Sequence, residues 1–121
     1  LGCDTVVAVG RRILNKAESE DDARAFLKLL SGRRHRVVGG LTIIGPDGKA
    51  HDRLVSTTVA FKRLESTDID AYIAGGEWHG KAGGYAIQGR AAVFVRKIIG
   101  SHSNVVGLPL FETAQLLKGL G

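Results

Sequence analysis

A glycine-rich stretch at positions 75–89, GGEWHGKAGGYAIQG, concentrates the residue types best suited to chemistry. Six of its fifteen residues are glycine, which lets a backbone approach a ligand closely and turn successive N–H groups toward an anion. Lys81 adds a point charge suited to phosphate, and Gln88 offers a donor and an acceptor for the edge of a base. The stretch lacks the order of a P-loop, so two interpretations stay open: a phosphate-binding loop, or a flexible loop of solvated polar residues.

A carboxylate and a lysine near the start of the chain form the second candidate group. Asp4 and Thr5 lead into an apolar run, and a carboxylate at a strand end can bind a metal or act as a general base. An aspartate in that place also commonly makes an ordinary turn or cap. Lys16 follows in a polar connection, where it could reach a phosphate or simply be solvated.

Several other kinds of site are disfavoured by the sequence. His35 and His79 lie far apart, and no cysteine or paired histidine has the spacing of a zinc site. No serine, histidine and aspartate stand in an order typical of a hydrolase triad. Cys3, the single cysteine, is interpreted as a packing residue, and its isolation excludes an internal disulfide and favours a reducing, cytoplasmic location.

Composition and charge narrow the class of protein and of ligand. The chain has 121 residues, 44% of them hydrophobic and 24% charged, which is typical of one globular domain. The net charge of +5 is spread over short clusters at 11–12, 33–36 and 62–63, and none contains an aromatic residue. Nucleic-acid binders usually concentrate charge and aromatic side chains on one face, so a small polyanion is favoured over nucleic acid. No apolar run approaches the length of a membrane span.

The elements that must position these residues follow from the apolar pattern. Helices are expected after the cap at Ser19 to about residue 30, after Ser66 or Thr67 to about 75, and over 109–117. Strands are expected at 5–9, 35–44, 55–61 and 91–99, with a turn at 45–48, a polar connection at 10–18 and a polar loop at 101–104. The strands on either side of the turn at 45–48 are expected to form an antiparallel hairpin. This order predicts a mixed α/β (α+β) domain.

Specific motifs lie along the whole chain. Residues 3–7, CDTVV, resemble an A-D-T-V-V strand, and residues 30–37, LSGRRHRV, match L-S-G-x-x-H-x-V. Further matches are ILNKA at 13–17, STTVAF at 56–61, GE followed by KAGGYAIQG within 76–89, and NVVGLPL at 104–110. In this order the segments resemble the Maf family of septum-formation-inhibitor-like nucleotide pyrophosphatases, whose fold implies a central mixed sheet flanked by helices.

The resemblance implies an activity and a role for each candidate residue. Members of the family hydrolyse a nucleoside triphosphate to the monophosphate and pyrophosphate with a divalent cation (Mg²⁺, Mn²⁺ or Co²⁺). Asp4 would then accept a proton and bind the metal, Lys16 and Lys81 would bind the triphosphate, and Thr5 and Gln88 would choose the base. The Asp-Thr and Ile-Gln-Gly steps resemble the dTTP/UTP branch. Because the family is often dimeric, a homodimer is one expected state; no membrane partner is expected.

The chain also departs from the family pattern. Asn15 and Ala17 replace the usual glycine and proline around Lys16. The family's first strand and Ser-Pro-Arg-Arg loop have no counterpart, so residues 1–121 are expected to be the C-terminal two-thirds of one Maf-like domain and to be impaired in catalysis alone. The alternative function is a non-catalytic nucleotide-binding regulatory module linked to septum formation. Asp4→Asn separates the two, because in an enzyme it should abolish turnover and leave nucleotide binding. A nucleic-acid-binding domain is a third, weaker interpretation.

Overall fold

A long antiparallel hairpin forms the centre of the structure, a computed structural model that describes residues 1–120. Strand β3 (Arg34–Ile44) pairs with β4 (Ala50–Phe61) along its whole length, and the chain reverses between them at Gly45–Gly48. Gly48 has a φ of +77°, which glycine adopts without strain and which explains the Gly-Pro-Asp-Gly turn. The hairpin predicted from the sequence is confirmed.

Three further strands extend the hairpin into a five-stranded sheet of order β2-β1-β3-β4-β5. Strand β1 (Gly2–Val9) pairs with β3, β5 (Val95–Ile99) pairs with β4, and every pairing within residues 1–120 is antiparallel. Among the described residues, strand β2 (Arg12–Leu14) pairs only with Val7–Val9. Strand β2 lies within the polar connection expected at 10–18, and its three residues are too few to show a period of two.

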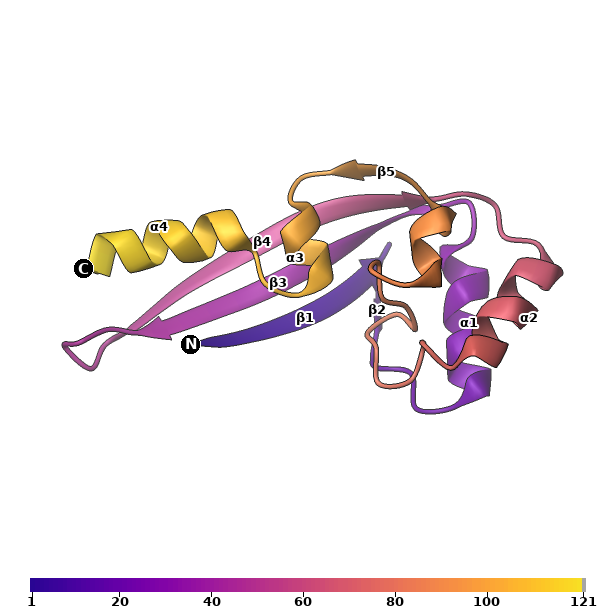
Figure 1. Ribbon diagram of the computed structural model, residues 1–121, viewed down its shortest axis with the longest axis horizontal. Helices are drawn as coiled ribbons and strands as arrows, with labels where there is room; N and C mark the ends of the chain where they lie inside the picture. Colours follow the sequence, from indigo (N-terminus) through magenta and orange to yellow (C-terminus); the bar gives the residue numbers. More distant parts are fainter. Residues whose placement is uncertain (121) are drawn as a thin grey trace.

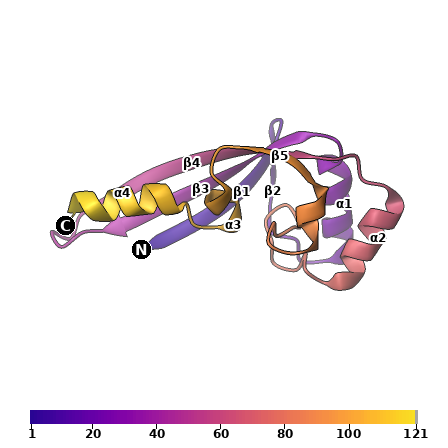
Figure 2. The same ribbon diagram turned by 45° about the horizontal axis from the view of Figure 1, so that its top comes forward.

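Two helices pack together at one end of the sheet, and a third extends along the other end (Figures 1 and 2). Helix α1 (Glu20–Leu30) begins as predicted, because the Ser19 hydroxyl accepts a hydrogen bond from the Asp22 N–H. Helix α2 (Ser66–Gly75) is capped by Glu65, not by Ser66 or Thr67, since Glu65 and Asp68 form a reciprocal capping box. Helix α4 (Leu110–Leu120) lies beside the hairpin at the end away from α1 and α2.

Two predictions for residues 90–106 are wrong in detail. The expected strand at 91–99 begins instead with a 3₁₀ helix, η1 (Arg90–Phe94), because Ala91 and Phe94, three residues apart, are both buried. The expected loop at 101–104 contains the start of a short helix, α3 (His102–Val106). The Ser101 hydroxyl caps this helix by accepting a hydrogen bond from the Asn104 N–H.

The main core lies between one face of the sheet, helices α1 and α2, and the glycine-rich segment that follows α2. Its largest fully buried side chains include Phe61, Tyr72, Leu14, Leu27 and Leu30. This arrangement confirms the mixed α/β class. The expectation that residues 1–121 form one domain stays a prediction. Residue 121 lies outside the described residues. No helix within residues 1–120 is long and apolar enough to cross a membrane.

Candidate functional site

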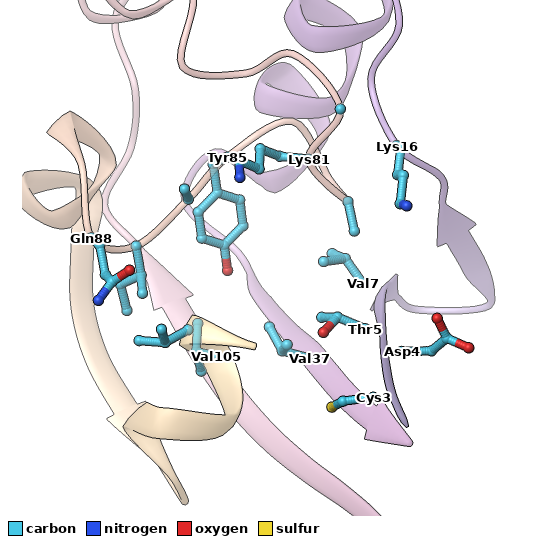
Figure 3. Close-up of a pocket in the computed structure, with 15 residues that line it drawn as sticks. Cys3, Asp4, Thr5, Val7, Lys16, Val37, Lys81, Tyr85, Gln88 and Val105 are labelled. Carbon is cyan, nitrogen blue, oxygen red and sulfur yellow. The ribbon is translucent and has the colours of Figure 1, made fainter. Parts of the chain in front are cut away.

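A pocket of about 290 Å³ brings all five candidate residues together. They come from segments far apart in the chain: β1, the connection after β2, and the loop between α2 and η1. Side chains of α3 complete the wall (Figure 3). The candidate residues that line it are Asp4, Thr5, Lys16, Lys81 and Gln88.

Backbone pairing brings the segments that carry Lys16 and Lys81 side by side. The segment around Lys16 forms an isolated antiparallel bridge with Ala82. The Ala17 N–H donates to the Lys81 carbonyl at 3.0 Å, and the Gly83 N–H donates to the Asn15 carbonyl at 3.2 Å. Both lysine side chains are exposed, and neither forms an ion pair within residues 1–120. The pocket therefore carries two cationic groups that can neutralise a polyanion.

The N–H groups around Lys81 in the glycine-rich loop bond within the backbone and do not converge on an anion as its sequence suggested. The N–H groups of Gly80, Lys81, Gly83 and Gly84 all donate to backbone carbonyls. Gly83 has a φ of +69°, and a Cβ there would lie 3.0 Å from a Val7 methyl carbon. The glycines thus allow tight turns and close packing against β1. Any charge for binding an anion comes from the lysine side chains.

Thr5 and Asp4 occupy opposite sides of β1. Successive side chains of a strand point to opposite faces, and Figure 3 shows Thr5 directed toward the side of Tyr85 and Gln88, with the Asp4 carboxylate on the other side of the strand. Strand β2 pairs with β1 only from Val7 onward, so no strand within residues 1–120 covers the β2-side edge of β1 at Asp4. A ligand that crosses this open edge could contact both residues.

Tyr85 lines the pocket and pairs with His35, a buried residue outside the lining; neither residue was expected in the site. The Tyr85 hydroxyl and the His35 Nε2 lie 2.6 Å apart, and the Phe61 ring packs edge-on against both rings. Burial raises the pKa of the Tyr85 hydroxyl, which therefore stays protonated. The sequence offered one signal for these residues, since His35 and Tyr85 both lie in segments that match the family motifs. Neither residue has the spacing of a recognised catalytic motif.

This pair makes the stability of the fold depend on pH. Burial lowers the pKa of His35 from 6.5 to about 4, so the folded protein keeps the ring neutral while the unfolded chain protonates it. Stability is full above pH 6.5 and falls as the pH drops toward 4, by about 3 kcal/mol in total. Urea unfolding between pH 7.5 and 4 should show this loss, and His35→Gln should remove most of it. An unchanged slope in that variant, with the exposed His102→Gln as control, would contradict the assignment.

Helix α3 forms the remaining wall and is held by buried polar contacts. The fully buried Asn104 side chain donates from Nδ2 to the carbonyls of Val37 and Val55 at 3.0 and 2.9 Å, and contacts the Thr57 hydroxyl oxygen at 3.1 Å. After the helix, the Gly107 carbonyl accepts a hydrogen bond from the Cys3 thiol at 3.0 Å. Burial, with a smaller effect of Asp4, raises the pKa of Cys3, which supports the packing role expected for this residue.

The side chains that line the pocket could hold a metal ion only together with oxygen atoms of a bound ligand. No group of three or more histidine, cysteine, aspartate and glutamate side chains within residues 1–120 could hold a metal ion. Asp4 is the only carboxylate that lines the pocket, and it is exposed. Mg²⁺ is commonly bound by one or two carboxylates together with substrate phosphates and water. The residues therefore fit a cation held jointly by Asp4 and a phosphorylated ligand, and they do not fit a cage made by the protein alone.

Comparison with known proteins places the chain in a family. The model of the Maf-like protein family matches residues 1–120. The chain is 66% identical over all 121 residues to the dTTP/UTP pyrophosphatase of Paramagnetospirillum magneticum, 63% to that of Granulibacter bethesdensis and 62% to that of Mesorhizobium japonicum. It covers 64%, 57% and 58% of those proteins, or about three fifths of their length. The chain therefore belongs to the Maf-like protein family.

Proposed function

We propose that the full-length gene product hydrolyses pyrimidine nucleoside triphosphates, dTTP and UTP foremost, to the monophosphate and pyrophosphate. The proposal rests on one observation: the same pocket is lined by all five candidate residues, Asp4, Thr5, Lys16, Lys81 and Gln88. The relatives in the comparison are named dTTP/UTP pyrophosphatases, which supports the same substrate class. The free Cys3 fits the reducing cytoplasm, where such nucleotides occur.

The pocket offers distinct surfaces for the two halves of such a substrate. Uracil and thymine present a carbonyl, an imide N–H and a second carbonyl along one edge. The Thr5 hydroxyl and the Gln88 amide can each donate and accept, so they can match that edge. Lys16 and Lys81 would bind the triphosphate and neutralise the charge that develops as the bond between the α- and β-phosphates breaks.

Asp4 has the role of proton acceptor in this proposal. Its carboxylate would orient the attacking water and take its proton as the pyrophosphate leaves. A nucleotide whose base lies near Gln88 would have to pass its phosphates over the open edge of β1 to reach this group. A divalent cation held by Asp4 and the phosphates would supply further neutralisation of the substrate's charge.

The selectivity of pyrophosphate release tests the proposal. The full-length gene product and the 121-residue chain would be assayed with dTTP, UTP, dCTP, CTP, dATP and GTP in Mg²⁺ or Mn²⁺. We expect the full-length product to release pyrophosphate fastest from dTTP and UTP. Binding of these nucleotides without any release would contradict the enzyme and favour the regulatory module. Release that favours purines would contradict the assignment of Thr5 and Gln88.

A further inference from the structure

Two hydrogen bonds hold the backbone on either side of Gln88, and both acceptors lie in or just after helix α2. The Ala86 N–H donates to the Tyr72 hydroxyl oxygen at 3.3 Å, and the Arg90 N–H donates to Glu77 Oε2 at 3.0 Å. Between them Gln88 is exposed to the pocket and forms no hydrogen bond of its own side chain within residues 1–120. The position from which its side chain reaches into the pocket therefore depends on how firmly its backbone is held.

Glu77 also packs directly against the residue that follows Gln88. A Cβ placed on Gly89 would lie 2.7 and 2.8 Å from the two carboxylate oxygens of Glu77 and 2.9 Å from its Cδ. Only glycine leaves room for this contact, since real Cβ atoms do not approach oxygen so closely. The carboxylate thus fills the space beside the turn and accepts a charge-assisted hydrogen bond from it.

Tyr72 supports the same turn from the core. Its side chain is fully buried in the main cluster, and burial raises its pKa to about 12, with the nearby Glu77 charge adding to the rise. The hydroxyl therefore stays neutral and keeps its place against the Ala86 N–H at any physiological pH. Glu77 is only half-buried, so a substitution there should disturb the core less than a substitution of Tyr72.

We propose that Glu77 is a positioning residue that sets the base selectivity of the pocket by fixing the turn that carries Gln88. This inference rests on the proposed function, because it takes Gln88 as the group that reads the base. Uracil presents an acceptor at C4 and a donor at N3, whereas cytosine presents a donor and an acceptor at those positions. A Gln88 side chain placed beside the base edge can pair with uracil, and a displaced turn would move the amide out of reach and weaken the preference for uracil over cytosine.

The test measures the ratio of affinities for UTP and CTP, which share the sugar and the triphosphate. Their α,β-methylene analogues, which cannot be cleaved between the α- and β-phosphates, would be titrated into the full-length gene product by calorimetry. Glu77→Ala should lower the UTP-over-CTP ratio about tenfold, which corresponds to the loss of about one hydrogen bond. Glu77→Gln, which keeps an acceptor oxygen, should restore most of the ratio. The exposed His79→Ala, in the same loop, is the matched control.

A second pair of variants covers the case in which Glu77→Ala fails to fold. Gly89→Ala should also lower the ratio, because its methyl group would displace the Glu77 carboxylate. Where Glu77→Ala does fold, the same methyl should cost less in that background than it does alone. An unchanged UTP-over-CTP ratio in folded Glu77→Ala, or in Gly89→Ala, would overturn the inference. Failure of the wild-type protein to cleave UTP, with a normal affinity ratio, would instead overturn the proposed function.

Discussion

Replacing Asp4 by asparagine should lower the rate of dTTP hydrolysis by about 10²- to 10⁴-fold, the usual contribution of a positioned proton acceptor. The substitution preserves the shape of the side chain and removes its basicity. Because Asp4 is exposed at an edge of β1 that no strand covers within residues 1–120, it should not disturb the fold. Steady-state pyrophosphate release by the full-length gene product, compared with wild type, measures the effect.

The affinity for nucleotide separates this prediction from a simple loss of binding. With the cleavage-resistant dTTP analogue, Asp4→Asn should bind within a few-fold of wild type, since Lys16 and Lys81 remain. Asp21→Asn, which removes an exposed carboxylate from the first turn of α1, controls for the change of net charge. A rate for Asp4→Asn equal to that of the control would contradict the role of Asp4 and leave the pocket without a proton acceptor.

Replacing Asn104 by alanine should destabilise the protein by about 3 kcal/mol. The side chain is fully buried and bridges β3 and β4 through the carbonyls of Val37 and Val55. Alanine would leave these groups without their partner and open a cavity under α3. Chemical unfolding in urea, with the exposed Asn15→Ala as control, measures the loss.

A substitution of Gly39 tests the packing of the Asn104 side chain independently. A Cβ at that position would overlap the Asn104 Oδ1 and lie 3.3 Å from its Cγ, so Gly39→Ala should force the side chain out of its site. Overpacking of this kind costs about 1–3 kcal/mol. The cost should shrink in the Asn104→Ala background, where the oxygen is gone. Strictly additive effects of the two substitutions would contradict the contact between them.

The hairpin and its helices were predictable because their signals are local. Alternating apolar residues define β3 and β4, and the Ser19 cap with the acidic turn after it defines the start of α1. Strand β2 was missed because its pairing with β1, and not its own pattern, makes it a strand. The 3₁₀ helix at Arg90–Phe94 was read as a strand because Ala91, Val93 and Phe94 are apolar, and single-sequence patterns do not show the Glu77 carboxylate that binds its first N–H.

The candidate residues could be named from the sequence, and their arrangement could not. Motif resemblance selected the five residues that the pocket gathers. It did not reveal that the loop N–H groups are used within the backbone, because this depends on the pairing of Lys16 with Ala82, far apart in the chain. Nor did it show that Asp4 and Thr5 face opposite sides of β1, or that Tyr85 lines the pocket and pairs with His35.

The identity of the products formed from dTTP, and their dependence on the two lysines, tests the central claim most directly. The full-length gene product should yield dTMP and pyrophosphate in equal amounts, and Lys16→Gln combined with Lys81→Gln should raise the KM for dTTP by at least about tenfold. Formation of dTDP and phosphate would place the cleavage at a different bond. An unchanged KM in the double variant would show that the triphosphate does not occupy this pocket.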